Sequence, residues 1–77
     1  MKIFIDGRAR SVHRSITLDR LMMFVEESQV YMSDFGLCIA CGEDFIHVEP
    51  DARGYECEVC GEDTVFGAEE LLFEVAG

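Results

Sequence analysis

The chain has 77 residues, a formal net charge of −10 and four cysteines, and it contains no tryptophan. This length allows one domain with a small hydrophobic core, and chains of this size often need a metal ion or disulfides for stability. No apolar run is long enough to span a bilayer, and no apolar signal segment precedes the chain. We therefore expect a cytoplasmic protein with a single domain, residues 1–77, and no membrane association.

Charge is distributed unevenly along the sequence. Residues 1–20 contain five basic and two acidic residues and carry a net charge of +3, whereas residues 21–77 carry −13. A strongly acidic surface repels the phosphates of nucleic acids. Only the N-terminal segment could therefore attract a nucleic acid.

The first segment, residues 1–34, is predicted to begin with a β-hairpin. Met1–Ile5 has the pattern of a strand with Ile3 and Ile5 on one face, Asp6-Gly7 is a two-residue hairpin signal, and residues 8–12 would form the return strand. Basic residues on a strand edge discourage strand addition. We therefore interpret four residues as a solvated hairpin edge: Arg8, Arg10, His13 and Arg14. The alternative is a nucleic-acid-binding surface made of Arg8, Arg10, Arg14 and Arg20.

A helix is predicted over Leu18–Tyr31. Ser15 or Thr17 can cap its N-terminus, and Asp19 is favourable in the first turn. One apolar face has helical spacing and is expected to pack on the rest of the domain. Its members are Leu18, Leu21, Met22, Val25 and Met32.

Four further apolar residues of this helix fall outside that face. Phe24 and Tyr31, seven residues apart, form a second stripe, and Met23 and Val30 lie on the far side. The helix could simply be more apolar than it needs to be. Alternatively, these residues bind a partner protein or a second copy of the chain, because apolar residues beyond the core stripe often mark an interface. The candidate partner-binding residues are Met23, Phe24, Val30 and Tyr31.

All four cysteines fall in two copies of one motif. Cys-x-x-Cys-Gly-Glu-Asp occurs at residues 38–44 and again at 57–63, with 15 residues between the two cysteine pairs. Two cysteines separated by two residues can direct both sulfurs to one ion from a tight turn, which we call a knuckle. The glycine then lets the chain leave the turn with a positive φ. The spacing is that of a four-cysteine metal site, so the predicted ligands are Cys38, Cys41, Cys57 and Cys60.

Four thiolates form a closed tetrahedral set, which indicates a structural metal ion rather than a catalytic one. We predict one Zn²⁺, with iron as the second choice because tetrahedral sulfur ligation suits both metals. With four thiolates and a divalent ion, the net charge would be about −12. Two other interpretations of the four cysteines are less favoured. Two disulfides would need an oxidising compartment, and two redox-active Cys-x-x-Cys sites would each need a helix beginning next to the first cysteine. His47 is interpreted as a surface residue because four cysteines complete the site.

The second segment, residues 35–77, is predicted to contain short strands on both sides of each knuckle. These strands are expected at residues 35–37, at 45–48, from Tyr55, and at 64–66, with a turn at 49–54. Gly67 is expected to interrupt the chain. Residues 68–75 could then form one helical turn or a short final strand.

Residues 35–66, with two Cys-x-x-Cys-Gly knuckles, resemble a zinc ribbon. Residues 48–57 and 67–72 are more particular and look like small uncharacterised zinc-ribbon proteins of bacteria and their phages. The resemblance implies a metal-held ribbon behind a helical N-terminal part, and it implies no activity. Rubredoxins share the paired knuckles, but they have a longer gap between them and an aromatic core that this chain lacks. The expected fold is therefore α+β: a zinc ribbon preceded by a short β segment and one amphipathic helix.

The leading functional hypothesis is a non-catalytic structural-zinc protein that acts as a protein-interaction or adaptor module and can associate with itself. A nucleic-acid-binding or transcription-regulatory role is the first alternative, and a rubredoxin-like iron electron carrier is the second. We expect no enzyme activity and no small-molecule substrate. The sequence has no nucleophile with a paired base and no phosphate-cradling loop.

Overall fold

The computed structural model describes residues 2–5 and 7–76. These residues form two antiparallel sheets and two helices, which confirms the α+β class. The elements are β1 (Lys2–Ile5), β2 (Arg8–Ser11), α1 (Leu18–Tyr31), β3 (Phe35–Cys38), β4 (Asp44–Ile46), β5 (Tyr55–Glu56), β6 (Asp63–Gly67) and α2 (Ala68–Ala76). β1 and β2 pair as a hairpin, and the other four strands form one sheet in the order β4-β3-β6-β5.

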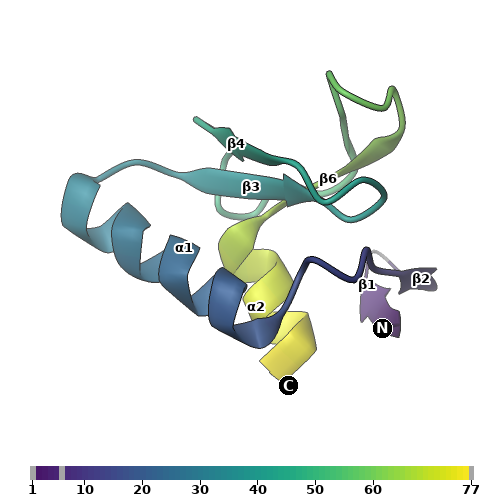
Figure 1. Ribbon diagram of the computed structural model, residues 1–77, viewed down its shortest axis with the longest axis horizontal. Coiled ribbons are helices and arrows are strands. Elements are labelled where there is room, and N and C mark those ends of the chain that lie inside the picture. The colour runs from purple at the N-terminus through teal and green to yellow at the C-terminus, as the bar shows by residue number, and fades with distance from the viewer. Residues whose placement is uncertain (1, 6, 77) are drawn as a thin grey trace.

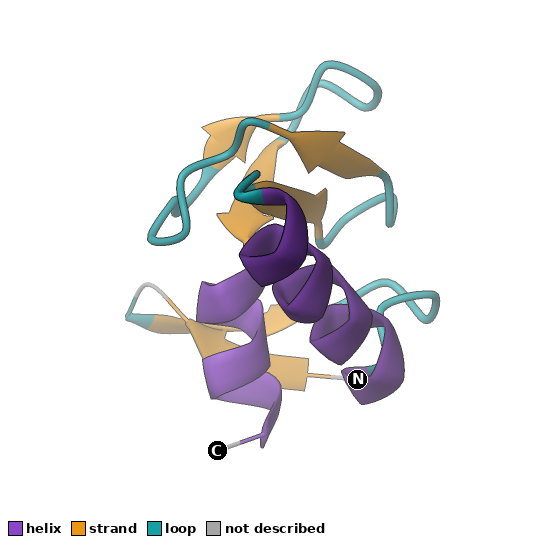
Figure 2. Cartoon of the chain, turned by 90° about the vertical axis from the view of Figure 1, so that its left-hand side faces the viewer, coloured by secondary structure: helices purple, strands orange, loops and turns teal. Residues whose placement is uncertain are grey.

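The two helices lie against one face of the four-stranded sheet. Figure 1 shows the sheet above α1 and α2, with the β1–β2 hairpin at one end of the helix layer. The quarter turn in Figure 2 shows the helices packed side by side beneath the sheet. Within residues 2–5 and 7–76, no helix has both the length and the apolar character needed to cross a membrane.

One hydrophobic core joins the sheet, both helices and the hairpin. Leu37 of β3 is paired with Phe66 of β6, and both side chains are fully buried. Leu21 from α1 and Leu71 from α2 are fully buried in the same core, and Ile5 joins it from β1. The core therefore draws side chains from both halves of the chain, so that neither half encloses it alone.

The bounds predicted for α1 are confirmed. Thr17 caps the helix, because its side-chain oxygen accepts a hydrogen bond from the backbone N–H of Arg20 at 3.2 Å. Met32 ends the helix in the left-handed region, with a φ of 54°. Of the two capping candidates, Ser15 and Thr17, the structure therefore uses Thr17, and the left-handed end at Met32 was not predicted.

The buried face predicted for α1 is only partly confirmed, because Leu21 is fully buried and Val25 packs against the core. Leu18, Met22 and Met32 of the expected core stripe are exposed, and Met32 retains 92% of its accessible surface. Phe24, which we expected outside the core, is only 8% exposed, and its ring centroid lies 5.4 Å from that of Phe35. The helix contacts α2 and β3 at the same time. These two neighbours together decide which face of the helix turns inward.

Residues 68–76 form a second helix, where we expected one helical turn or a strand. Gly67 does not interrupt the chain, because it is the last residue of β6 and α2 follows at once. Its N–H donates to the backbone oxygen of Ala52 at 3.0 Å. A Cβ at Gly67 would clash with the backbone oxygen of Pro50. The glycine therefore permits the loop between β4 and β5 to cross close over the end of β6.

The predicted strand at residues 45–48 is shorter than expected. β4 ends at Ile46, and His47 adopts a φ of 61°, which takes the chain out of the extended conformation. Val48 is then buried beside Val65, whereas Ile46 remains exposed. The chain therefore folds back over the sheet face at His47 instead of continuing along its edge.

The β1–β2 hairpin has the expected pairing of Ile5 with Arg8 and the expected inward face, with Ile3 and Ile5 buried. Met1 of the predicted strand and Asp6 of the predicted turn lie outside the described residues. Residues paired across an antiparallel ladder share one face. Since Arg10 is paired with Ile3, its side chain also faces inward.

The basic residues of this region do not form a uniformly solvated edge. Arg8 and Arg14 are exposed, as expected, but Arg10 and His13 are half-buried. The Arg10 guanidinium carbon lies 5.4 Å from the centroid of the Phe66 ring, which is cation–π geometry. The interpretation as a solvated edge is therefore corrected for Arg10 and His13.

We predict that Phe24→Ala destabilises the fold much more than Tyr31→Ala. Removing a buried phenylalanine typically costs about 3–5 kcal/mol, whereas surface substitutions usually stay within about 0.5 kcal/mol. Phe24 is buried against Phe35, and Tyr31 is 69% exposed. Urea unfolding of both variants would measure the difference, and equal losses of stability would contradict the observed face of α1.

Candidate metal centre

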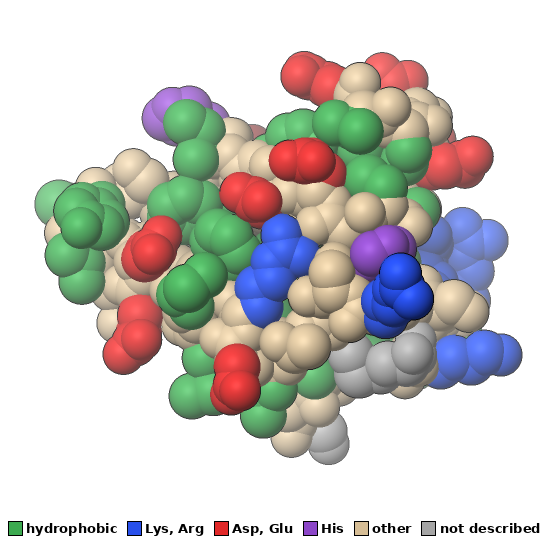
Figure 3. Space-filling model, in the orientation of Figure 1, with side chains coloured by type: hydrophobic (Ala, Val, Ile, Leu, Met, Phe, Trp, Pro, Cys, Tyr) green, Lys and Arg blue, Asp and Glu red, His purple; other side chains and the backbone are tan. Residues whose placement is uncertain are grey.

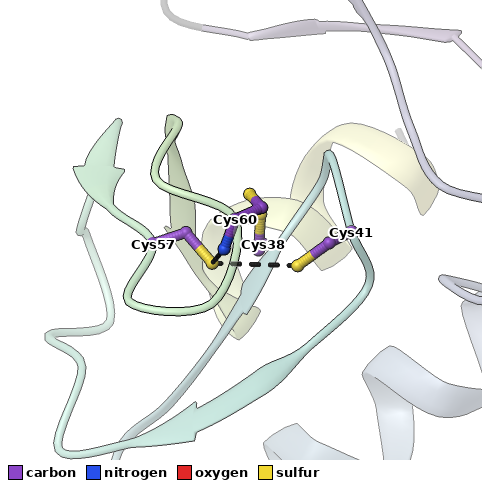
Figure 4. A group of neighbouring side chains, drawn as sticks. All are labelled: Cys38, Cys41, Cys57 and Cys60. Carbon is purple, nitrogen blue, oxygen red and sulfur yellow. Dashed lines mark hydrogen bonds between the residues drawn. The ribbon is translucent and has the colours of Figure 1, made fainter.

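The pairing of β3 with β6 brings the two knuckles together. Cys38 ends β3 and is paired with Val65 of β6, and the second knuckle directly precedes β6. The sulfur atoms of Cys38, Cys41, Cys57 and Cys60 all lie within 4.8 Å of one another (Figure 4). The fold therefore brings the four predicted ligands together, although they are up to 22 positions apart in the chain.

The two knuckles have matching backbone geometry. The N–H of Gly42 donates to the oxygen of Cys38 at 2.8 Å, and the N–H of Gly61 donates to that of Cys57 at 2.9 Å. Both glycines have a positive φ, 82° and 79°. Sulfur distances match as well: 3.6 Å from Cys38 to Cys60 and 3.7 Å from Cys41 to Cys57. The motif repeat is therefore a pair of equivalent turns facing each other.

These sulfur distances fit a tetrahedral ion. Zinc–sulfur bonds of about 2.3 Å imply sulfur–sulfur edges of about 3.8 Å in a regular tetrahedron. Two of the six edges, Cys38–Cys60 at 3.6 Å and Cys41–Cys57 at 3.7 Å, are close to this value, and all lie within 4.8 Å. They are far longer than the bond of about 2.05 Å that joins the sulfurs of a disulfide, and none of the four cysteines forms a disulfide. The arrangement can hold one metal ion by all four sulfurs.

The first knuckle is packed against the N-terminal segment, and the second is not. The N–H of His13 donates to the backbone oxygen of Ile39 at 2.7 Å, and Ile39 is buried in the main core. The side chains of His13 and Ser15 lie so close to Gly42 that a Cβ there would clash with them. At Gly61 a Cβ would meet nothing within 4 Å. The first knuckle is thus fixed by the main core, while the second is held through Cys57 in a smaller buried cluster and exposes residues 58–61.

The thiols differ in acidity because of their surroundings. Burial raises the pKa of Cys38, but hydrogen bonds from the Thr64 hydroxyl and from the backbone of Cys41 and Ala40 outweigh it and lower the pKa to about 7. For Cys41, the backbone of Glu43 lowers the pKa. Burial and the neighbouring cysteine sulfurs more than offset this and raise the pKa to about 12.

The pKa of Cys60 is also raised. A backbone hydrogen bond from Glu62 lowers it, but burial and the neighbouring sulfurs of Cys38 and Cys57 have the larger combined effect. Several thiolates cannot collect at one point without a cation to offset their repulsion. Binding of a cation would therefore release protons from these thiols.

Thr64 is a functional residue that the sequence reasoning missed. Its Oγ1 lies 3.0 Å from the Cys38 sulfur, and its backbone oxygen accepts from the N–H of Ile39 at 2.9 Å. Hydroxyl groups bonded to ligating atoms orient them and tune their basicity. Thr64 follows the second Cys-Gly-Glu-Asp repeat directly, where the first repeat has Phe45. This difference between the two repeats was the one feature of the sequence that could have pointed to Thr64.

The other predicted site residues lie apart from the cysteines. His47 is exposed and does not belong to the cluster. Met23, Val30 and Tyr31 are exposed on α1 and line a shallow hollow of about 470 Å³. Phe24 is buried in the core, so its prediction as a partner-binding residue is wrong.

Comparisons with protein families, with curated proteins and with solved structures give no match for this chain.

We predict that Thr64→Val weakens metal binding about 10–100-fold at pH 7, the range typical for losing a group that supports a ligand. Without the hydroxyl, the pKa of Cys38 rises above about 7, so protons compete more strongly with the metal. The deficit should therefore shrink as the pH is raised. Competition with a chromophoric chelator measures the affinity. Thr64→Ser, which keeps the hydroxyl, is the control, and an equal loss in both variants would contradict this role.

Proposed function

We propose that this chain is a zinc-ribbon protein whose single structural Zn²⁺ is held by Cys38, Cys41, Cys57 and Cys60. The observation that supports this proposal is the pair of matched knuckles whose sulfurs lie within 4.8 Å of one another, with edges near those of a zinc tetrahedron. When bound, the ion would supply a cross-link between the β3–β4 and β5–β6 hairpins. Zinc suits this role because it has no redox chemistry and accepts a tetrahedral site.

A non-catalytic role fits a closed ligand set. Four sulfur ligands leave no coordination position for a substrate or an activated water. The metal would instead stabilise a small fold, since binding energy at such a site is largely folding energy. The protein would then act through its surface, as an interaction or adaptor module in the cytoplasm.

The surface that supports an interaction role is the outer side of α1. Met23, Val30 and Tyr31 are exposed there, Val30 at 71% and Tyr31 at 69%. Exposed apolar residues gathered on one helix face are a common mark of protein interfaces. We propose that these three residues mediate self-association, in which a symmetric contact would use the same patch twice.

A nucleic-acid-binding role has weaker support. Lys and Arg side chains gather at the hairpin end of the face shown in Figure 3, while acidic side chains are spread over the rest of it. Two of the four arginines proposed for such a role are engaged within the fold. Arg10 stacks on Phe66, and Arg20 forms an ion pair with Asp44 at 3.2 Å. The protein-interaction role is therefore preferred.

We predict that the purified native protein contains one zinc ion per chain and that Cys38→Ser and Cys60→Ser each abolish metal binding and cooperative folding. His47→Ala is the control and should retain both. Metal analysis by mass spectrometry and circular dichroism would measure the two properties. Stoichiometric iron in protein grown with both metals would overturn the choice of zinc, and loss of metal in His47→Ala would contradict the ligand set.

We predict that Val30→Asp combined with Tyr31→Asp abolishes self-association and leaves metal content unchanged, because both side chains are exposed. Analytical ultracentrifugation over a range of concentrations would measure the association. Leu18→Asp combined with Met22→Asp places the same charges on another exposed flank of α1 and should leave the association intact. A wild-type protein that remains monomeric at high concentration would contradict self-association while leaving the metal proposal standing.

A further inference from the structure

A second surface feature lies on the face of the four-stranded sheet that points away from the helices. Leu37 and Phe66 point into the main core, so their neighbours Cys38 and Val65 point to the opposite face. Tyr55 of β5 is paired with Val65 and shares that face. Between the loop after β4 and the second knuckle, this face contains a groove of about 390 Å³.

The groove combines aromatic walls with negative charge. Phe45 and Tyr55 line it, with Val65 buried beneath them, and Glu56 and Glu58 line the side next to the second knuckle. Neither lysine nor arginine is among its lining residues. Its volume lies within the range of about 300–1,000 Å³ that is usual for ligand sites.

Tyr55 is held in place within this groove. Its hydroxyl donates to the carboxylate of Glu49 at 3.0 Å. The ring therefore presents a fixed aromatic face bordered by carboxylates.

His47 shapes the opposite wall of the groove. It lines the groove and has a φ of 61°, a left-handed conformation that is uncommon for a side chain other than glycine. Because the backbone turns at this residue, β4 ends at Ile46 and Val48 folds into the sheet face. Residues in such conformations are concentrated at functional sites.

From these observations we infer that the groove binds an arginine side chain of a basic partner peptide. A guanidinium group can stack on an aromatic ring and at the same time form paired hydrogen bonds with a carboxylate, which lysine cannot do in the same geometry. Tyr55 and Phe45 supply the aromatic faces, and Glu56 and Glu58 supply the carboxylates. None of the four cysteines lines the groove, although Glu56 and Glu58 flank Cys57, and the exposed residues of α1 are not part of it.

Charge complementarity favours a basic occupant over a neutral or acidic one. Residues 21–77, which form the whole groove, carry a net charge of −13. Such a field attracts cationic partners and repels anionic ones, including nucleic acids. The partner is therefore a peptide segment with arginine, and its binding weakens as salt is added.

The test uses the full-length chain with its native metal. The probe is the blocked peptide acetyl-Ala-Arg-Ala-Arg-Ala-amide, and the matched peptide carries neutral citrulline in place of each arginine. Titration followed by NMR should shift the amide signals of Tyr55, Glu56 and Val65 with the arginine peptide only. Glu56→Gln combined with Glu58→Gln should weaken binding about tenfold, as expected for two partly solvated ion pairs.

Two further variants make the result specific. Glu26→Gln combined with Glu69→Gln changes the net charge equally, but at exposed residues outside the groove, and should retain the affinity. Tyr55→Leu keeps an apolar side chain but removes the aromatic face, and should weaken binding. Metal content, measured for every variant, should be unchanged.

Three outcomes would overturn the inference. Equal binding of the citrulline peptide would mean that the groove accepts any apolar chain. Equal losses in the two glutamate pairs would mean that long-range charge alone attracts the peptide. An oligomer that dissociates only in the Glu56/Glu58 variant would mean that a second copy of the chain occupies the groove.

Discussion

The pairing of β3 with β6 is the interaction on which the rest of the structure depends. On one face of this pair, Leu37 and Phe66 form the centre of the hydrophobic core. On the other face, Cys38 and Val65 lie together, which brings the two knuckles to within reach of one ion. Since α2 follows β6 without a break, the same pairing also delivers α2 to α1. One strand pair thus positions the core, the cysteine cluster and the second helix.

The four cysteine sulfurs lie so close together that their ionised forms would repel one another. Four sulfurs within 4.8 Å of one another cannot all be ionised without a cation, and the raised pKa values of Cys41 and Cys60 express that conflict. A metal ion bound by the four cysteines would remove this repulsion and would join the two hairpins at the same time. The first knuckle is anchored to the main core through Ile39, and the second to the smaller cluster on the other sheet face through Cys57. An ion would join these two anchored turns directly.

The surface divides into regions of different character. The described ion pairs, Arg20 with Asp44 and Arg53 with Glu70, tie each helix to the sheet or its connecting loop, but exposed pairs of this kind add little stability. The exposed side of α1 offers apolar contact, and the outer sheet face offers an acidic aromatic groove.

The sequence by itself determined the local features of this protein: the two knuckles with their four cysteines, the bounds of α1, and the register of the first hairpin. It narrowed the helix cap to Ser15 or Thr17, and the structure selects Thr17. Each of these local features depends on residues a few positions apart, whose turn and capping chemistry acts without help from the rest of the chain. Only the tertiary structure decided which face of α1 is buried, that residues 68–76 form a helix, and that Thr64 reaches Cys38. These outcomes depend on which elements the pairing of β3 with β6 places opposite one another. The sequence of α1 has more than one apolar face, and the elements that pack against the helix determine which of these faces is buried.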